Sequence, residues 1–273
     1  MMNSESHRTL LEAARQPTPL VLLLALSLLV LPLQALCDSP QAPALGSWPT
    51  LRSHLYGTRS IGEVGDELMS VEAPASTPEP SATPVTIHFG DGLAGALKQV
   101  RVIIDNNPSP LVATIDLSSK LPLDEIDLRV RIDRFTSVRA IAETTDGRLE
   151  MRSTWVNASG GCSAPPSAAA GGTLGEIRFR PSSAGKALQI SIRHPNNSGF
   201  QIDPRTGDPI APHFISHIAL RAGENTLLTA ETGISISENP TLRIAARTAL
   251  PVPLTFEATD VPTQARYTAT WEP

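Results

Sequence analysis

The sequence predicts an all-β protein built from two β-sandwich domains that a Gly/Ala/Pro-rich segment joins. Apolar and polar residues alternate in short segments, as at 126–133 and 188–193, which is typical of half-buried strands. The 25 prolines and 18 glycines among 273 residues disfavour long helices. The alternation stops at 157–174, where Gly, Ala, Ser and Pro dominate, and it resumes afterwards. We therefore expect one sandwich on each side of this segment.

Residues 1–37 have the features of a secretory signal peptide. Basic residues precede an apolar run at 20–31, which is shorter than the roughly 20 residues that a transmembrane helix needs. Small residues follow, and they fit a cleavage site between Cys37 and Asp38. The sequence thus predicts an exported, soluble protein that has no membrane contact after cleavage.

Residues 38–84 form a Pro/Ala-rich N-terminal segment. Within it Trp48, Leu51 and Leu55 have helical spacing, which predicts a short helix that docks on the fold.

The first sandwich is expected over 85–156 and the second over 175–273, and each is of ordinary domain size. The Asp146-Gly147 pair predicts a hairpin turn. Further strands are expected at 100–105, 111–117, 148–155, 242–246, 254–258 and 267–271.

Charge and ligand chemistry exclude several function classes. The formal net charge is −5, whereas nucleic-acid binding needs a basic surface. Two cysteines cannot build a four-Cys zinc site or an iron–sulfur cluster. His213 and His217 lie four residues apart, but their apolar neighbours favour a strand, on which the two Cα atoms would be about 13 Å apart. We therefore expect neither a metal nor a cofactor.

Cleavage of the signal peptide leaves one cysteine, Cys162, inside the 157–174 segment. Exported cysteines are normally paired, so an unpaired one points to a function. Gly160 and Gly161 precede it, and we expect them to make this arm flexible and to let the thiol protrude. Because the arm carries no fixed charge, the thiol pKa is expected near its reference value of about 8.5. Such a thiol suits a group that other enzymes load and unload.

Three alternatives remain open for Cys162. It could be an incidental linker thiol, whereas a buried core cysteine is not expected, because its neighbours are not apolar. It could also be a nucleophile whose base, His88 or His194, is brought in by folding. An autonomous thiol enzyme, such as a peroxidase, would need a lowered thiol pKa.

A long polar loop starts at His194 and continues to residue 212. Long loops are often functional, so His194, Asn196 and Asn197 are candidates for a surface that faces a partner. A structural network of Asn and Asp turns is an equally good interpretation.

Several motifs, in one order, resemble the SoxYZ-type sulfur carrier proteins in the form that fuses both halves. More narrowly, they resemble the quinoprotein-dehydrogenase-associated SoxYZ-like carriers. The motifs are 104–108 (IDNNP), 142–147 (AETTDG), 160–165 (GGCSAP), 194–199 (HPNNSG) and 234–240 (ISISENP). The resemblance implies an immunoglobulin-like SoxY-like sandwich, followed by a SoxZ-like sandwich packed against it.

The resemblance also implies a function for Cys162, which matches the family's swinging-arm cysteine. A periplasmic carrier would hold a sulfur-containing intermediate covalently on this thiol and present it to partner enzymes, without catalysis of its own. The partners would be enzymes of sulfur oxidation or of a quinoprotein dehydrogenase system. The alternative is a non-covalent accessory module of a periplasmic quinoprotein (PQQ) dehydrogenase, in which Cys162 is dispensable.

Overall fold

The structure is a computed structural model that describes residues 48–167, 172–182 and 184–272. All of them belong to one compact unit, Ala42–Pro273. The predicted signal peptide at 1–37 lies outside the described residues. Within the described part of the chain, no helix is long and apolar enough to cross a membrane.

Strands are the main secondary structure of the described chain, as the alternation predicts. The elements, in order, are α2 (Trp48–Tyr56), β1 (Gly62–Glu63), β2 (Met69–Glu72), η1 (Pro80–Ala82), β3 (Thr83–Phe89), α3 (Asp91–Ala94), β4 (Leu97–Ile104), β5 (Leu111–Leu117), β6 (Leu123–Val130), β7 (Thr136–Thr144), β8 (Leu149–Val156), β9 (Ile177–Pro181), β10 (Ala187–Ile192), β11 (Phe214–Ala222), β12 (Asn225–Thr232), β13 (Thr241–Ala246), β14 (Leu254–Val261) and β15 (Arg266–Trp271).

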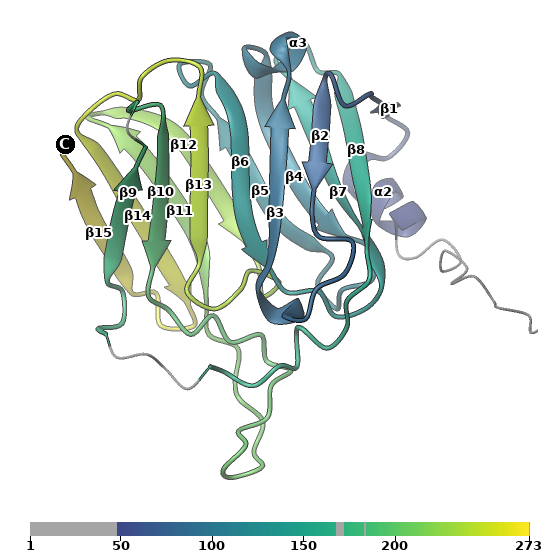
Figure 1. Ribbon diagram of the computed structural model, residues 1–273, viewed down its shortest axis with the longest axis vertical. Coiled ribbons are helices and arrows are strands. Elements are labelled where there is room, and N and C mark those ends of the chain that lie inside the picture. The colour runs from purple at the N-terminus through teal and green to yellow at the C-terminus, as the bar shows by residue number, and fades with distance from the viewer. Residues whose placement is uncertain (1–47, 168–171, 183, 273) are drawn as a thin grey trace, which may run out of the picture. The chain divides into compact units, whose positions relative to one another are not determined.

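The strands form two sheets that face each other (Figure 1). The larger sheet has the order β1-β8-β7-β4-β5-β12-β11-β14-β15, and the smaller has the order β2-β3-β6-β13-β10-β9. The predicted all-β class with two sandwich halves is confirmed. Each sheet runs through both halves, because β5 pairs with β12 in one sheet and β6 pairs with β13 in the other. The halves are therefore joined edge to edge by backbone hydrogen bonds.

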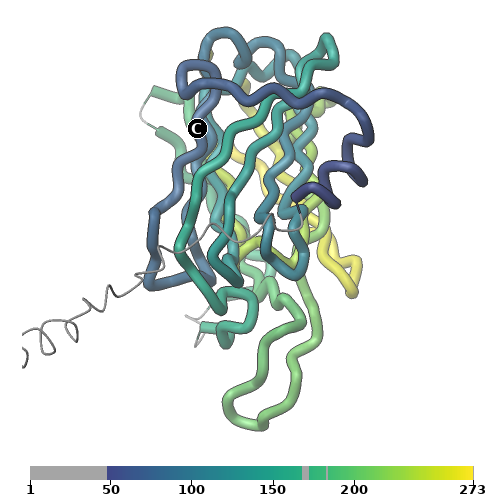
Figure 2. Tube along the Cα trace, turned by 90° about the vertical axis from the view of Figure 1, so that its right-hand side faces the viewer, coloured from purple at the N-terminus to yellow at the C-terminus, as the bar shows by residue number. Residues whose placement is uncertain are grey.

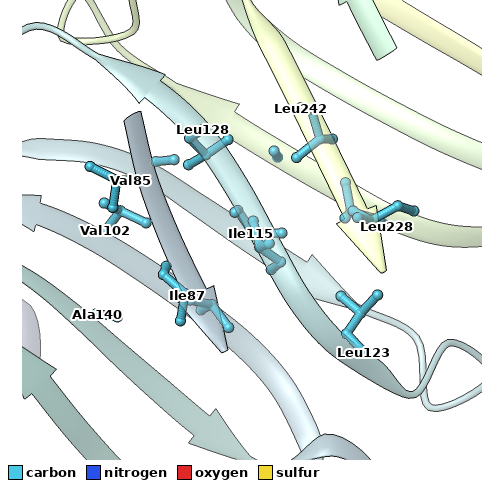
Figure 3. Packing of buried hydrophobic residues seen from close by; sticks show 14 of the residues in the cluster. Val85, Ile87, Val102, Ile115, Leu123, Leu128, Ala140, Leu228 and Leu242 are labelled. Carbon is cyan, nitrogen blue, oxygen red and sulfur yellow. The ribbon is translucent and has the colours of Figure 1, made fainter. Parts of the chain in front are cut away.

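The main hydrophobic core extends through both halves, as Figure 3 shows around Leu128 and Leu242. Ile115 and Leu128 of the first half line the same internal cavity of about 20 Å³ as Leu242 and Phe256 of the second. All four side chains are buried. Because neither half completes this core alone, the two halves stabilise each other.

The predicted docking helix is confirmed as α2. Trp48, Leu51 and Leu55 pack against a second, smaller apolar cluster that includes Ile103 and Met151 of the large sheet. The segment around α2 also supplies β1 and β2, two strands too short to show an alternating pattern in the sequence. The predicted hairpin at Asp146-Gly147 is confirmed too, since β7 ends and β8 begins on either side of it.

Candidate functional site

The candidate site lies at one end of the two sheets, where the cysteine arm and the long loop after β10 emerge together (Figures 1 and 2). The arm follows β8 and belongs to the first half of the chain. The loop, residues 194–213, connects β10 to β11 and belongs to the second half. The site is thus formed from both halves.

The arm is docked through its own backbone. The amide of Gly160 donates to Asp133 O at 2.9 Å, and that of Gly161 donates to Ile132 O at 2.9 Å. A Cβ atom at position 161 would lie only 2.2 Å from the Pro80 carbonyl oxygen and 2.6 Å from that of Ile132. Glycine is therefore required at 161 for close approach of two backbones. Gly160 adopts a φ of +78°, the left-handed region that also favours glycine.

The thiol of Cys162 is buried, with no exposed surface. The prediction of a protruding thiol with a pKa near 8.5 is therefore wrong for this structure. Burial, followed by the negative charge of Asp133, raises the pKa of Cys162 to about 12, and Arg131 acts in the opposite direction. The sequence could not show this, because Asp133 and the covering residues come from other parts of the chain.

The flexibility of the arm stays a prediction, but residues 157–167 are docked on the sheets in this structure, and residues 168–171 lie outside the described residues. The second half of the chain holds the arm in place. Ser198 Oγ donates to Cys162 O, and Gln201 Nε2 donates to Ala164 O at 3.0 Å. The amide and the hydroxyl of Ser167 both donate to the carboxylate of Glu238, at 2.9 and 2.6 Å.

Arg131, just after β6, links the arm to the loop. Its side chain is 1 % exposed, and its Nη atoms donate to Gly161 O at 3.2 Å and to Asn196 O at 3.3 Å. Its Nε is buried without a hydrogen-bond partner among the described residues. Burial lowers the pKa of Arg131, while the neighbouring Cys162 and Glu238 raise it. The guanidinium also borders a cavity of about 290 Å³ that Ser167 and Glu238 line.

The start of the loop is built into the fold. His194 and Asn196 are buried, and the prediction that they face a partner is wrong for both. The Asn196 side chain donates to Ile236 O and accepts from the amide of Ile215, at 3.0 and 2.9 Å. Asn197, half-buried, exchanges backbone hydrogen bonds with His213. These residues form a structural network of turns, which is the second of the two interpretations of this loop given above.

A cluster at the base of the loop joins His194 and His213 to Asp260 of β14. His194 Nε2 lies 3.2 Å from His213 Nε2 and 3.5 Å from Asp260 Oδ2. His213 Nε2 lies 2.8 Å from the same Asp260 oxygen. All three lie within 4.8 Å of one another, close enough to share one metal ion. However, the amide of Asn196 donates to Nδ1 of His194 at 3.1 Å, so the proton of the neutral ring must be on Nε2. A ring in that tautomer donates a hydrogen bond, whereas ligation would require the proton on Nδ1.

The same cluster holds a buried carboxylate in its charged form. Burial alone would raise the pKa of Asp260, but hydrogen bonds from Thr263, His213, Tyr267 and the amide of Ala265 outweigh it and hold the pKa well below its ordinary range. Burial, followed by the proximity of His213, lowers the pKa of His194 and keeps that ring neutral. The cluster therefore anchors the base of the loop that holds the arm.

The sequence missed this cluster because its members come from three separate segments. Spacing in the sequence instead pairs His213 with His217, four residues away. His217 turns to Glu231, with Nδ1 2.8 Å from the carboxylate, so the two histidines have different partners, as the strand argument predicts.

Among the described residues, neither proposed base is hydrogen-bonded to the thiol. His88 lies between Glu72 and Glu125, at 3.6 Å from each carboxylate, near the end of β3 that leads to α3. The arm docks against Pro80, beyond the other end of that strand. Among the described residues, no hydrogen bond of His194 reaches Cys162.

Comparisons with known proteins divide the chain at the arm. A family model described as "Sulfur oxidation protein SoxY" matches residues 52–162, and one described as "Sulphur oxidation protein SoxZ" matches residues 178–270. The first match ends on Cys162 itself.

Among solved structures, the sulfur carrier protein SoxY from Chlorobium limicola f thiosulfatophilum is 21 % identical, with a TM-score of 0.35, and the match covers 41 % of this chain and 94 % of that one. The BSP domain of a biofilm associated protein is 12 % identical, with a TM-score of 0.25, over 74 % of this chain and 29 % of that one. No curated protein matches the chain.

Proposed function

This chain belongs to the SoxYZ-type proteins of sulfur oxidation, in the form that fuses both halves, and from that premise we propose that it carries a sulfur-containing group covalently on Cys162. One observation carries the assignment to this residue. The match to the SoxY family ends on Cys162, and this is the one free cysteine in the part of the chain that the structure describes. The thiol would take the group from one enzyme and present it to the next, as a persulfide, a thiosulfonate or a mixed disulfide.

The way in which the arm is attached supports this role. Loop hydrogen bonds, rather than a strand ladder, hold residues 160–167 to the sheets. Each such bond contributes about 0.5–1.5 kcal/mol net, so the arm can detach while the two sheets stay folded. An extended chain from Val156 to Cys162 would span about 20 Å, which sets an upper limit on the reach of the detached thiol.

The proposal includes a place and a set of partners. The signal-peptide features of residues 1–37 support a periplasmic location. The partners would be enzymes of sulfur oxidation that load and unload Cys162. We propose no catalysis by the carrier itself, because burial raises the pKa of this thiol, whereas an enzymatic nucleophile needs a lowered one or a base in contact.

Intact-mass analysis of the protein purified from its native cells tests the proposal. Cells should be harvested while they oxidise a reduced sulfur compound. We expect species that are heavier by sulfur or sulfonate groups, that revert with a thiol reductant, and that map to Cys162. The Cys162→Ser protein, prepared in parallel, should lack them. Unmodified Cys162 in such cells, together with normal sulfur oxidation by the Cys162→Ser strain, would refute the covalent role.

The burial of Cys162 favours one second candidate function. A thiol without exposed surface and with a raised pKa is also what a dispensable cysteine would show. In that case the chain would act as a non-covalent accessory module, with a periplasmic quinoprotein dehydrogenase as the partner. A pull-down from native extract in which Cys162→Ala keeps every partner, with function intact in cells, would select this candidate. Loss of partners or function would select the covalent carrier.

A further inference from the structure

We propose that the arm is a switch operated by its own cargo: it docks while Cys162 is an unloaded, uncharged thiol, and an anionic sulfur group on Cys162 releases it. This inference rests on the proposed function, since it concerns the group that Cys162 would carry. It follows from the space and from the charges around the docked thiol.

Space around Cys162 is closed. The residue has no exposed surface, and its neighbour Gly161 is pressed against the backbone oxygens of Pro80 and Ile132. Ser198 holds the Cys162 carbonyl from the other side. A sulfur atom added to the thiol extends it by a bond of about 2.05 Å. Because the residue has no exposed surface, an added sulfur atom would have to find room inside the docked site.

Charge strengthens the exclusion of an anionic cargo. Asp133 and Arg131 are the charged groups that act on the thiol, and the negative effect of Asp133 is the larger of the two. The Nη atoms of Arg131 are already committed to the carbonyls of Gly161 and Asn196, and Glu238 acts on the same guanidinium. The docked site therefore favours an uncharged sulfur.

The penalty for an anion at this position is large. Docking raises the thiol pKa from 9.0 to about 12, which corresponds to about 10³-fold discrimination against the charged form. A thiolate can avoid this penalty by taking up a proton. An S-sulfonate keeps its charge at every physiological pH, so it can avoid the penalty only by leaving the site.

The consequence is directional. An empty carrier would retract its thiol, which protects it from oxidation in an oxidising compartment. A loaded carrier would present its arm to the next enzyme. Partner enzymes would then meet an extended arm when it bears cargo.

The test compares three chemical states of the full chain. To make the S-sulfonate, Cys162 first reacts with dithiobis(nitrobenzoate), so that a mixed disulfide with one thionitrobenzoate forms and the second thionitrobenzoate leaves. Sulfite then attacks the cysteine sulfur, a new S–S bond forms, and thionitrobenzoate leaves with the electron pair of the broken bond. Methyl methanethiosulfonate produces a neutral control. In this reaction the cysteine sulfur loses its proton, gains a methylthio group to form a methyl disulfide, and methanesulfinate leaves. The third state is the free thiol.

Hydrogen exchange at Gly160 and Gly161 reports the position of the arm, because both amides donate to backbone oxygens only when it is docked. We expect protected amides in the free thiol. The S-sulfonate should exchange 10²- to 10³-fold faster, and the neutral methyl disulfide should show a smaller increase. Equal protection in the thiol and the S-sulfonate would overturn the proposal. So would unprotected amides in the free thiol, or equal release by the neutral adduct.

Two variants separate charge from packing. Asp133→Asn removes the nearby negative charge and should shrink the difference between the charged and neutral adducts. Ser198→Ala removes one hydrogen bond to the arm and should speed exchange about fivefold with the thiol still empty. Ser153→Ala, at an exposed position of β8, serves as the matched control. Since the cargo is attached chemically, the result does not depend on whether cells load Cys162, so this proposal and the proposed function can fail separately.

Discussion

The substitution Gly161→Ala should convert the buried thiol into an exposed one. The added Cβ would lie 2.2 Å from Pro80 O and 2.6 Å from Ile132 O, both of which are backbone atoms that cannot rotate away. The least costly response is detachment of the arm. The effect should reach the thiol, because Gly161 and Cys162 are adjacent.

The magnitude follows from the two states of the thiol. At pH 8, a thiol with a pKa of 9.0 is about 10 % thiolate, and one with a pKa of about 12 is about 0.01 % thiolate. The alkylation rate of Cys162 at pH 8 should therefore rise in the variant, by up to about 10³-fold. The midpoint of the rate against pH should fall from above 9 in the parent to about 9 in the variant.

Stopped-flow alkylation of the native protein over a range of pH is the assay, with circular dichroism to check the fold. Two matched substitutions calibrate it. Gly95→Ala places a Cβ in open space at an ordinary backbone conformation, so it should change nothing. Gly160→Ala meets no close atom but strains a residue at φ +78°, so its effect should be intermediate. A folded Gly161→Ala protein with the parent's rate and midpoint would refute the docking argument.

Four further predictions concern Arg131, His194, Asp260 and the shared core. Arg131→Met should speed alkylation of Cys162 more than tenfold, because it breaks the link between arm and loop. The free energy of unfolding should change by less than about 2 kcal/mol, because the substitution also removes a buried charge. A slower alkylation would contradict this prediction. Because the pKa of buried His194 is lowered, its contribution to stability is present above pH 6.5 and is lost as pH falls below that value. Urea unfolding should therefore show stability that declines from pH 7 to pH 5, and the decline should be shallower in His194→Gln. The lowered pKa of Asp260 adds a further loss as pH falls below 3.8, which Asp260→Asn should abolish. Phe256→Ala should cost about 3–5 kcal/mol and leave a single unfolding transition, since both halves share one core; two separate transitions in calorimetry would contradict that.

The two glycines before the cysteine show how one motif can serve two states. In the sequence, Gly160 and Gly161 predict flexibility, because they lack side chains. In the structure Gly161 lets two backbones approach where a side chain would not fit, and Gly160 adopts a left-handed φ that favours glycine. Both statements hold together if the arm alternates between a docked and a released position.

Local patterns in the sequence were enough to determine the all-β class, helix α2, the hairpin at Asp146-Gly147 and the presence of a lone cysteine between two halves. Alternation and turn chemistry depend on near neighbours in the chain, so they can be read without a fold. The pairing of β5 with β12, which merges two expected sandwiches into shared sheets, was decided only by the tertiary structure. A buried strand face looks the same whichever strand lies beside it.

The state of the thiol was also decided by tertiary structure. The arm contains no charge, yet Asp133 and Arg131, from beyond the end of β6, act on the Cys162 thiol, and Ser198 of the second half donates a hydrogen bond to the Cys162 carbonyl. Burial and electrostatics at this sulfur therefore arise from residues that are distant in sequence. The same holds for His194, His213 and Asp260, whose distances come from the meeting of three segments. The thiol pKa and the distances within this cluster are therefore set by the fold, whereas the residues themselves are already visible in the sequence.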